Sequence, residues 1–346
     1  MDVSEKYMSR CLKLAKNGQG HVAPNPMVGA VIVQDDRIIG EGYHRCYGEA
    51  HAEVNAVTSV SNEVLLRDST MYVSLEPCSH YGKTPPCAEL IIRKGIPRVV
   101  VAGPDPFPEV AGSGVGMLRD AGIEVVTGVM EQEAFELNRF FMTAHKKHRP
   151  YVILKWAQSE DGFLDRRREN CSEMPVLLSS PVTRLMVHKL RSEVQAIMVG
   201  TNTVILDNPS LTVRYWAGRS PLRITMDRNQ RIPDHVHLFD GQHPTLVYRE
   251  PADNSIHFLR SIMTDLYKRN INSLLVEGGA QLHRSFLEAD IWDEIIVETA
   301  PVKLGEGVAA ACFHCVPGVR LSGMKSVPSF SLHHSKSSLI EIYTHH

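Results

Sequence analysis

The sequence predicts an α/β protein of two domains, and three observations lead to that prediction. The chain has 346 residues, more than one hydrophobic core usually organises. Apolar strand-like runs alternate with amphipathic helical stretches, which is typical of sheets layered with helices. A basic polar run, "AHKKHRP" at residues 144–150, interrupts this alternation and ends in a proline. We therefore expect one domain at residues 1–146 and another at residues 147–346.

The first domain is predicted to contain a sheet whose strands are separated by helices. Asp35 and Asp36 provide turn residues between its first two strands. The predicted strands are "VGAVIVQ", "RIIGEGY", "TMYVSLEP", "PRVVVAG" and "IEVVTGV". The predicted helices are the stretch from Met8 to Ala15 that ends at Gly18, one beginning near His51, "CAELIIRKG", and one around residues 117–121.

The second domain repeats this alternation after the basic run. Its predicted strands are "YVILKWA", "QAIMVG", "LRITMD", "TLVYR", "SLLVEGG" and "DEIIVETAP". Helices are expected near residues 181–192, near residues 255–269, and directly after "SLLVEGG". This pattern predicts a second α/β domain.

Composition excludes several classes of protein. The net charge of −2 and pI near 6.8 give no reason to expect a general nucleic-acid or membrane-surface binder. The polar N-terminus lacks the apolar core of a signal peptide, so we expect a cytoplasmic protein. Seven cysteines in that compartment are expected to be buried thiols, metal ligands or nucleophiles rather than disulfides.

His51, Cys78 and Cys87 form a candidate metal site. His51 lies at the start of a predicted helix, Cys78 follows a strand, and Cys87 opens the next helix. One imidazole and two thiolates suit zinc, and three protein ligands leave the fourth tetrahedral position open for water. Bound zinc lowers the pKa of that water to about 7, which makes hydroxide available at neutral pH. The pattern therefore predicts a catalytic zinc site.

Glu53 is the candidate acid and base of this site. It follows His51 by two residues and can take a proton from the water and hand it to a leaving group. A structural zinc would need a fourth ligand, and Cys46, the one candidate, lies on the other side of His51. The zinc deaminase signature H-x-E…P-C-x-x-C is matched in its first half, but eight residues separate Cys78 from Cys87 here.

Three stretches, "PNPMVGAVIV", "GEAHAEVNA" and "LEPCSHYGKTPPC", resemble the deaminase half of the bifunctional riboflavin-biosynthesis deaminase–reductase family. The resemblance covers nearly the whole chain and is most specific in residues 24–87. It implies a cytidine-deaminase-like three-layer domain that deaminates a diaminopyrimidinone ribosylamine phosphate to a uracil. The long insert between the cysteines separates this family from cytidine, guanine and transfer-RNA adenosine deaminases.

The resemblance also implies contacts with this substrate. His80 and Lys83 would bind its phosphate, since lysine supplies a mobile point charge. The Asn25 amide would read an edge of the ring with donor and acceptor together, and His44 would contribute from a strand end. The residues alone favour a solvated loop charge for Lys83 and a capped core residue for His44.

Glycines in the second domain indicate close approach to a ligand. "LLVEGGAQL", residues 274–282, is a strand followed by two glycines and a helix, whose N-terminus can hold an anion. The Rossmann spacing is absent, so a conventional dinucleotide-binding fold is not supported. "MVGTNTVILDNPSLTVR", residues 198–214, places polar side chains on one turn-rich segment.

These segments, together with "LKWAQSEDG", resemble the reductase half of the same family, which has a dihydrofolate-reductase-like fold and uses NADPH. The resemblance implies hydride transfer to the opened ribose of the deaminated intermediate. Lys155 and Glu277 would lie at the reacting ribose carbon, and Glu277 would also bind the sugar phosphate with Arg191, Leu211 and Arg214. The implied cofactor contacts are Ala157, Thr203, Asp207, Gly279, Ala280, Gln281, Leu282, His283, Arg284 and Ser285.

Two places depart from the pattern of that family. "FLDRRRENCSEMPVLLSS", residues 163–180, is longer than the usual run and has Leu177 at a tryptophan position. Arg228 stands where a serine is usual, and it could favour a 2′-phosphate. We interpret both as lineage variation and expect residues 166–168 to be solvated.

Three hypotheses follow. The leading one is a bifunctional enzyme that uses Zn²⁺ and NADPH, forms a homo-oligomer (dimer or tetramer), and binds a small phosphorylated pyrimidine rather than nucleic acid or membrane. A second is a deaminase whose C-terminal domain has lost reductase activity and scaffolds assembly. A third is a zinc-stabilised nucleotide-binding module without catalysis, against which Glu53 and the polar loop argue.

Overall fold

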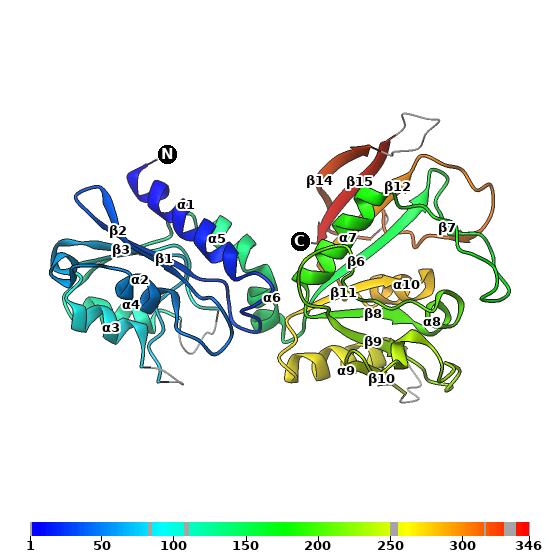
Figure 1. The fold of residues 1–346 in the computed structure, drawn as a ribbon, viewed down its shortest axis with the longest axis horizontal. Helices are drawn as coiled ribbons and strands as arrows, with labels where there is room; N and C mark the ends of the chain where they lie inside the picture. The colour runs from blue at the N-terminus through cyan, green and yellow to red at the C-terminus, as the bar shows by residue number, and fades with distance from the viewer. Residues whose placement is uncertain are drawn as a thin grey trace. The chain divides into compact units, whose positions relative to one another are not determined.

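The computed structural model describes residues 2–81, 85–106, 111–249, 255–314, 316–328 and 337–345. The chain divides into two compact units, Met1–His148 and Arg149–His346. Each unit carries its own sheet and its own helices (Figure 1). The basic run expected to lie between domains is partly helical, because α6 (Arg139–Lys147) includes its first residues.

The first unit contains a five-stranded sheet in the order β2-β1-β3-β4-β5. Its strands are β1 (Gly29–Gln34), β2 (Arg37–Tyr43), β3 (Thr70–Val73), β4 (Arg98–Val101) and β5 (Glu124–Thr127). β1 is antiparallel to β2 and β3, whereas β3, β4 and β5 are parallel. Asp35 and Asp36 both have positive φ angles, of 47° and 60°, as the tight turn of this hairpin requires.

Helices cover both faces of this sheet (Figure 1). α1 (Val3–Ala15) and α5 (Glu131–Leu137) pack on one face, where Met8 and Cys11 meet Val31. α2 (Ala52–Thr58), α3 (Cys87–Lys94) and α4 (Ser113–Asp120) pack on the other. Short 3-10 helices, η1 (Lys16–Gly18) and η2 (Glu63–Asp68), complete the unit. The result is the expected three-layer arrangement.

The second unit contains an eight-stranded sheet in the order β10-β9-β8-β11-β6-β12-β15-β14. Its strands are β6 (Tyr151–Ser159), β8 (Ala196–Gly200), β9 (Leu222–Met226), β10 (Thr245–Tyr248), β11 (Ser273–Gly278), β12 (Glu294–Ala300), β14 (Val319–Pro328) and β15 (Ser337–His345). β15 runs antiparallel to β12 and β14, and the other pairs are parallel. β7 (Phe163–Asp165) and β13 (Val308–Ala309) form a separate pair.

Side chains alternate between the two faces of this sheet. Leu154, Val276 and Val297 point into the main core, which α9 (Ser255–Lys268) and α10 (Ala280–Glu288) cover. The intervening positions face the opposite side, where α7 (Pro181–Glu193) lies (Figure 1). The remaining helices are α8 (Thr201–Asp207) and η3 (His237–Phe239).

Several elements of the second unit were not expected from the sequence. The segment interpreted as turn-rich contains the helix α8, and β7, β13, β14 and β15 were also missed. β14 exposes Leu321 and Met324, so it lacks a clear alternation of buried and exposed residues.

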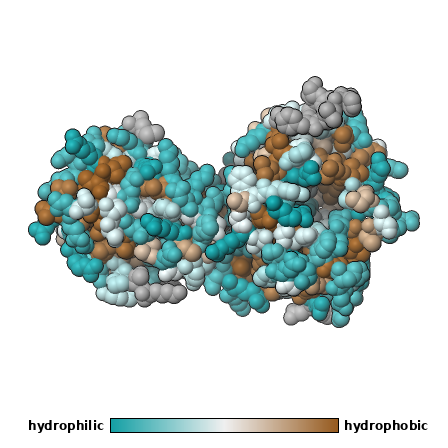
Figure 2. Space-filling model, viewed as in Figure 1, coloured by the Kyte–Doolittle hydropathy of each residue, from teal (hydrophilic) through white to brown (hydrophobic). Residues whose placement is uncertain are grey.

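The surface is mostly hydrophilic. In the visible face of each unit, hydrophobic residues appear as groups within a larger hydrophilic area (Figure 2). Among the described residues, no helix has the length and apolar character that crossing a membrane requires.

Candidate active sites

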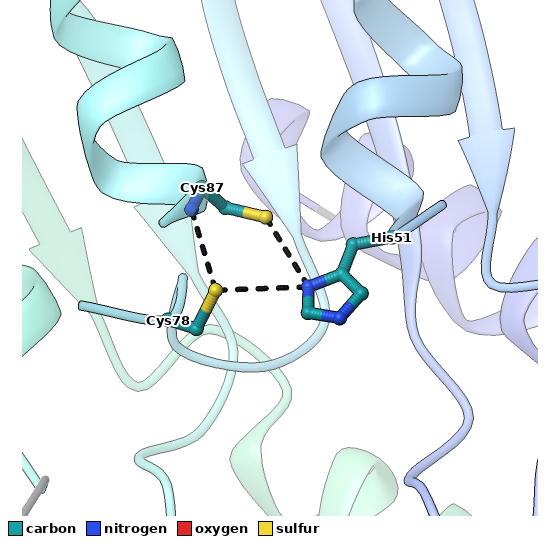
Figure 3. Close-up of side chains that lie close together, drawn as sticks. All are labelled: His51, Cys78 and Cys87. Atoms are coloured by element: carbon teal, nitrogen blue, oxygen red, sulfur yellow. Dashed lines mark hydrogen bonds between the residues drawn. The ribbon is translucent and has the colours of Figure 1, made fainter. Parts of the chain in front are cut away.

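Two helix starts and the loop after β3 bring His51, Cys87 and Cys78 together in the first unit (Figure 3). His51 is the extended residue directly before α2, with φ −70° and ψ 165°. Cys87 is the first residue of α3, and Cys78 lies on the loop after β3. The backbone N–H of Cys87 donates to Cys78 Sγ at 3.3 Å. The N-terminus of α3 therefore stabilises the Cys78 thiolate, and it also carries the sulfur of Cys87.

The donor atoms are spaced as one zinc ion requires. His51 Nδ1 lies 3.6 Å from Cys78 Sγ and 3.3 Å from Cys87 Sγ. A tetrahedral zinc with Zn–S near 2.3 Å and Zn–N near 2.0 Å has S···N edges of about 3.5 Å. In the described part of the chain no fourth donor, Cys46 included, joins this group. The three side chains therefore fit zinc with one position left for water.

Glu53 lies on the first turn of α2, beside this group. Its side chain is only 3% exposed. Burial, reinforced by the negative charge of Cys78, raises the pKa of Glu53 to about 7. A carboxyl group with such a pKa can both accept and release a proton near neutral pH.

His44 and Asn25 form a hydrogen-bonded pair next to His51. His44 Nδ1 lies 3.1 Å from the carbonyl oxygen of Ala50 and therefore donates to it. Its Nε2 is then an acceptor for the Asn25 amide N–H, 3.2 Å away. Burial lowers the pKa of His44, which favours this neutral form. The two rings of His44 and His51 meet edge to face, with centroids 5.6 Å apart.

The loop between the two cysteines is exposed at His80, Tyr81 and Pro85, whereas Pro86, next to Cys87, is buried. His80 is exposed, and the neighbouring Tyr81 hydroxyl donates to Glu89 at 2.6 Å. Lys83, the other predicted phosphate contact, lies outside the described residues. The structure thus brings His51, Cys78 and Cys87 together with Glu53, His44 and Asn25, while His80 remains at the surface.

Glu76 is a site-supporting residue that the sequence analysis missed. Its carboxylate accepts backbone N–H groups of Gly112, Gly114 and Val115 at 2.9, 2.9 and 3.1 Å, and of Asp105 at 3.3 Å. It thereby ties the start of α4 to the loop that carries Cys78. The sequence signal that could have found it is an acidic residue between an apolar strand and the Pro-Cys pair. A carboxylate buried at such a position needs hydrogen-bond donors as partners.

A large cavity in the second unit gathers the predicted cofactor residues. Its volume is about 1070 Å³. Its walls include the carboxyl ends of β6, β8 and β11, the position where ligands bind in open α/β sheets. The predicted residues that line it are Lys155, Ala157, Thr203, Asp207, Glu277, Gly279, Ala280, Gln281, Leu282, His283, Arg284 and Ser285.

Lys155 and Glu277 lie on neighbouring strands, β6 and β11, beside Arg191 of α7. The Arg191 guanidinium donates to both oxygens of Glu277, at 2.8 and 2.6 Å, so the carboxylate is held in a bidentate ion pair. Burial raises the pKa of Glu277, but Arg191 and, to a smaller extent, Lys155 lower it, and the net result is a lowered pKa. Burial lowers the pKa of Lys155, while Glu277 and Glu298 raise it.

Of the predicted sugar-phosphate residues, Glu277 lines the cavity, whereas Arg191, Leu211 and Arg214 lie around α7 and are not among its lining residues. Arg191 contacts the cavity wall indirectly, because it forms an ion pair with Glu277, which lines the cavity. The Arg214 backbone N–H donates to His188 Nδ1 at 2.9 Å, and its side chain is exposed. Leu211 is 2% exposed and has a φ of 54°, so its side chain packs inside the unit.

The residues 166–168 are not uniformly solvated, contrary to expectation. The Arg168 side chain is 7% exposed and pairs with Asp165 at 2.7 Å and with Asp207. It also donates to the Leu206 carbonyl oxygen at 3.1 Å. Arg168 therefore fastens the altered 163–180 segment to α8. Arg228 lines the same cavity.

Comparison with known proteins gives a consistent result for both units. Residues 150–321 match the family model of the RibD C-terminal domain. Residues 1–103 match the cytidine and deoxycytidylate deaminase zinc-binding region. The riboflavin biosynthesis protein RibD of Bacillus amyloliquefaciens is 39% identical over 348 residues, covering 94% of this chain and 91% of that protein. RibD of Escherichia coli is 37% identical and covers 94% of each chain.

Solved structures agree with this assignment. The deaminase/reductase of Thermotoga maritima, described as a diaminohydroxyphosphoribosylaminopyrimidine deaminase/5-amino-6-(5-phosphoribosylamino)uracil reductase, has a TM-score of 0.86 and 35% identity over 99% of both chains. Acinetobacter baumannii RibD has a TM-score of 0.86 and 32% identity over 99% of both. The expected fold classes are thereby confirmed. The chain belongs to the RibD family of riboflavin-biosynthesis proteins, which join a zinc-dependent deaminase and an NADPH-dependent reductase in one polypeptide.

Proposed function

We propose that this protein deaminates a diaminopyrimidinone ribosylamine phosphate and then reduces the ribosyl group of the resulting aminouracil to a ribityl group. The observation that carries this proposal is the pairing of two built sites. One is an open His51–Cys78–Cys87 group with a buried carboxyl beside it. The other is a large cavity with Lys155 and Glu277 at its wall.

Glu53 is the proton carrier of the deamination. A zinc ion on the three ligands supplies an activated water. Glu53 takes one proton of that water and passes it to the adjacent ring nitrogen as the oxygen adds to the ring carbon that bears the 2-amino group. It then takes the proton of the new C–OH and gives it to the amino nitrogen as the C–N bond breaks, so that ammonia leaves and a carbonyl remains. A pKa of about 7 suits both transfers.

Asn25 and His44 orient the pyrimidine in this proposal. Their mutual hydrogen bond at 3.2 Å holds the asparagine amide in one orientation at the zinc group. His80, exposed on the loop between the cysteines, and Lys83 bind the phosphate end.

Lys155 is the proton donor of the reduction. NADPH supplies the hydride, which adds to C1′ of the opened ribose. The electron pair of the C1′–N double bond moves to nitrogen, which takes a proton from the Lys155 ammonium. Glu277 and Arg191 position the sugar from the neighbouring strand and helix, with Leu211 and Arg214 nearby. The other predicted wall residues, from Ala157 to Ser285, hold the cofactor.

We also propose a cytoplasmic homo-oligomer that does not act on nucleic acid. The described cysteines are all free thiols, which suits a reducing compartment. The second unit exposes Leu185, Trp216, Leu321 and Met324, and exposed apolar side chains favour association with another surface. Sedimentation would distinguish a dimer or tetramer from a monomer.

A coupled assay tests the function. Purified protein with the diaminopyrimidine ribosylamine phosphate should release ammonia without NADPH, and should oxidise NADPH only after that release. Ammonia release without NADPH oxidation, even with the deaminated intermediate supplied, would support the scaffold alternative. Zinc content without either turnover would support the nucleotide-binding module.

A further inference from the structure

Glu298 is a buried carboxylate with no role in the mechanism so far. It lies near the end of β12, whose backbone pairs with β6 so that Glu298 is opposite Ala157 and Ile296 is opposite Lys155. Glu298 is 1% exposed. A carboxylate removed from water to this extent needs compensating partners, so its contacts are informative.

Those contacts connect Glu298 with Lys155. Glu298 Oε2 lies 3.9 Å from Lys155 Nζ and accepts the Ser179 hydroxyl at 2.6 Å. Its other oxygen, Oε1, is buried and accepts no hydrogen bond from any described residue. A buried acceptor without a donor is uncommon. Lys155 supplies the cationic group next to this carboxylate.

Two carboxylates flank Lys155 on one face of the sheet. The strand order β11-β6-β12 puts Glu277 on one side and Glu298 on the other. Their environments differ, because Glu277 is held by both arms of Arg191 whereas Glu298 has a neutral hydroxyl and Lys155. Lys155 lines the cavity, and Glu298 lies behind it, outside the lining residues.

We propose that Glu298 is a positioning residue for the reduction, which holds the Lys155 ammonium of β6 and directs it toward the substrate. This inference rests on the proposed role of Lys155 as proton donor. After the substrate nitrogen takes its proton, the neutral amine of Lys155 regains a proton from solvent, and Glu298 stabilises the restored ammonium.

The charges around Lys155 support this role. Burial lowers the pKa of Lys155 and Arg191 of α7 lowers it further, whereas Glu277 and Glu298 raise it. His283 of α10, which also interacts with Lys155, is neutral at working pH because burial lowers its pKa to about 4. Glu298 therefore acts together with Glu277 to favour the charged form of Lys155 against burial and Arg191.

The test compares Glu298→Gln with Glu298→Asp and with Glu288→Gln, an exposed carboxylate of the same unit. One readout is the pH profile of NADPH oxidation with the deaminated intermediate supplied. The second is independent of catalysis: the rate at which acetic anhydride acetylates Lys155 in the free protein, followed by peptide mass spectrometry. Ammonia release monitors the integrity of the first unit.

In Glu298→Gln the basic limb of the pH profile should move to lower pH. The rate should fall about tenfold near pH 9 and less than about twofold near pH 6, because a smaller fraction of Lys155 holds a proton. Acetylation of Lys155 near pH 8 should become faster, since the neutral amine is the reactive form. For Glu298→Asp, the shift of the pH profile and the acetylation rate should lie between those of the wild type and of Glu298→Gln. If Glu298→Gln does not fold, Glu298→Asp should still show the same direction of change.

The inference would be overturned if Glu298→Gln changed neither the pH profile of NADPH oxidation nor the acetylation rate of Lys155. It would also be overturned if Glu298→Gln lowered the rate of NADPH oxidation equally at every pH and Glu298→Asp did not restore that rate. If the wild-type protein oxidised no NADPH, the proposed function would fail instead. The acetylation rates would still report whether Glu298 controls Lys155.

Discussion

Two buried glutamates, Glu53 and Glu298, and the half-buried Glu277 carry the same carboxyl group in different surroundings. Glu53 lies beside the Cys78 thiol group and, within the described part of the chain, has no basic side chain paired with it, and burial, followed by Cys78, raises its pKa to about 7. Glu277 faces the Arg191 guanidinium, which lowers its pKa. Among the described residues, Glu298 has Ser179 and Lys155 as partners. Each role therefore follows from the neighbouring charges rather than from the residue type.

Replacing Glu53 by glutamine should remove the proton carrier while leaving the metal ligands in place. We expect ammonia release to fall by about 10²- to 10⁴-fold, the usual contribution of general acid–base catalysis. Zinc content by atomic absorption should match the wild type. Reduction of the supplied intermediate should be unaffected, because Glu53 belongs to the other unit. Wild-type rates of ammonia release in this variant would contradict the assignment.

At the scale of elements, α4 supports the zinc site through its first turn. Glu76 binds three backbone N–H groups there, as the positive end of a helix favours. The backbones of the helix and the Cys78 loop also meet closely. A Cβ on Gly114 would lie 2.0 Å from the Pro77 carbonyl oxygen, so this contact requires glycine.

Gly114→Ala should push α4 away from the Cys78 loop. We expect a destabilisation of about 1–3 kcal/mol, typical of overpacking, together with weaker zinc retention. Gly116→Ala is the matched control, because nothing lies within 4 Å of its added Cβ; it should stabilise the helix by about 0.5–1 kcal/mol. Urea unfolding measures the stability of the two variants, and a colorimetric chelator present during the unfolding measures their zinc release. Equal zinc release from the two variants would argue against the contact.

The loop between β7 and α7 shows how an element can be misjudged from composition. Three consecutive arginines suggested a solvated segment, yet Arg168 is buried between Asp165 and Asp207. Asp165 and Asp207 are far apart in the sequence. Only their convergence at one wall of the cavity makes a buried arginine favourable there.

At the scale of the whole molecule, two histidines couple the stability of the second unit to pH. Burial, with Arg191 and Arg214 adding to it, lowers the pKa of His188 to about 4, and burial lowers that of His283 to about 4. Unfolded histidine titrates near pH 6.5. Below about pH 6.5 the unfolded chain therefore binds more protons than the folded unit. Stability is fully present above this pH and decreases as the pH falls toward about 4.

Urea unfolding followed by tryptophan fluorescence measures this effect. All three tryptophans, Trp156, Trp216 and Trp292, belong to the second unit. We expect a lower midpoint near pH 5 than near pH 7.5. His188→Gln should flatten this dependence, whereas His235→Gln, at an exposed position, should not. Equal midpoints at both pH values would show that the histidines do not contribute.

The two activities should be separable by removing the metal. A strong chelator should abolish ammonia release and destabilise the first unit, since ligand binding and folding are coupled. The second unit has its own core, so it should still oxidise NADPH with the deaminated intermediate. Restoration of ammonia release by added zinc is the control. Parallel loss of both activities would indicate that the units do not work independently.

The sequence by itself determined the zinc ligands and the alternation of strands and helices. His51 and Cys87 lie at the starts of helices and Cys78 lies on the loop after β3, so periodicity and turn signals were sufficient to predict that they come near one another. The resemblance of "LVEGGA" and its neighbours then identified residues that do line a cavity.

Only the tertiary structure decided which charges oppose one another in the second unit. Lys155, Glu277 and Glu298 come from strands that are distant in the chain but adjacent in the order β11-β6-β12. Periodicity assigns each side chain to a face of its strand, yet it carries no information about which strands are neighbours. The pairing of Glu298 with Lys155, and of Arg168 with Asp207, depends on that order and on long-range packing.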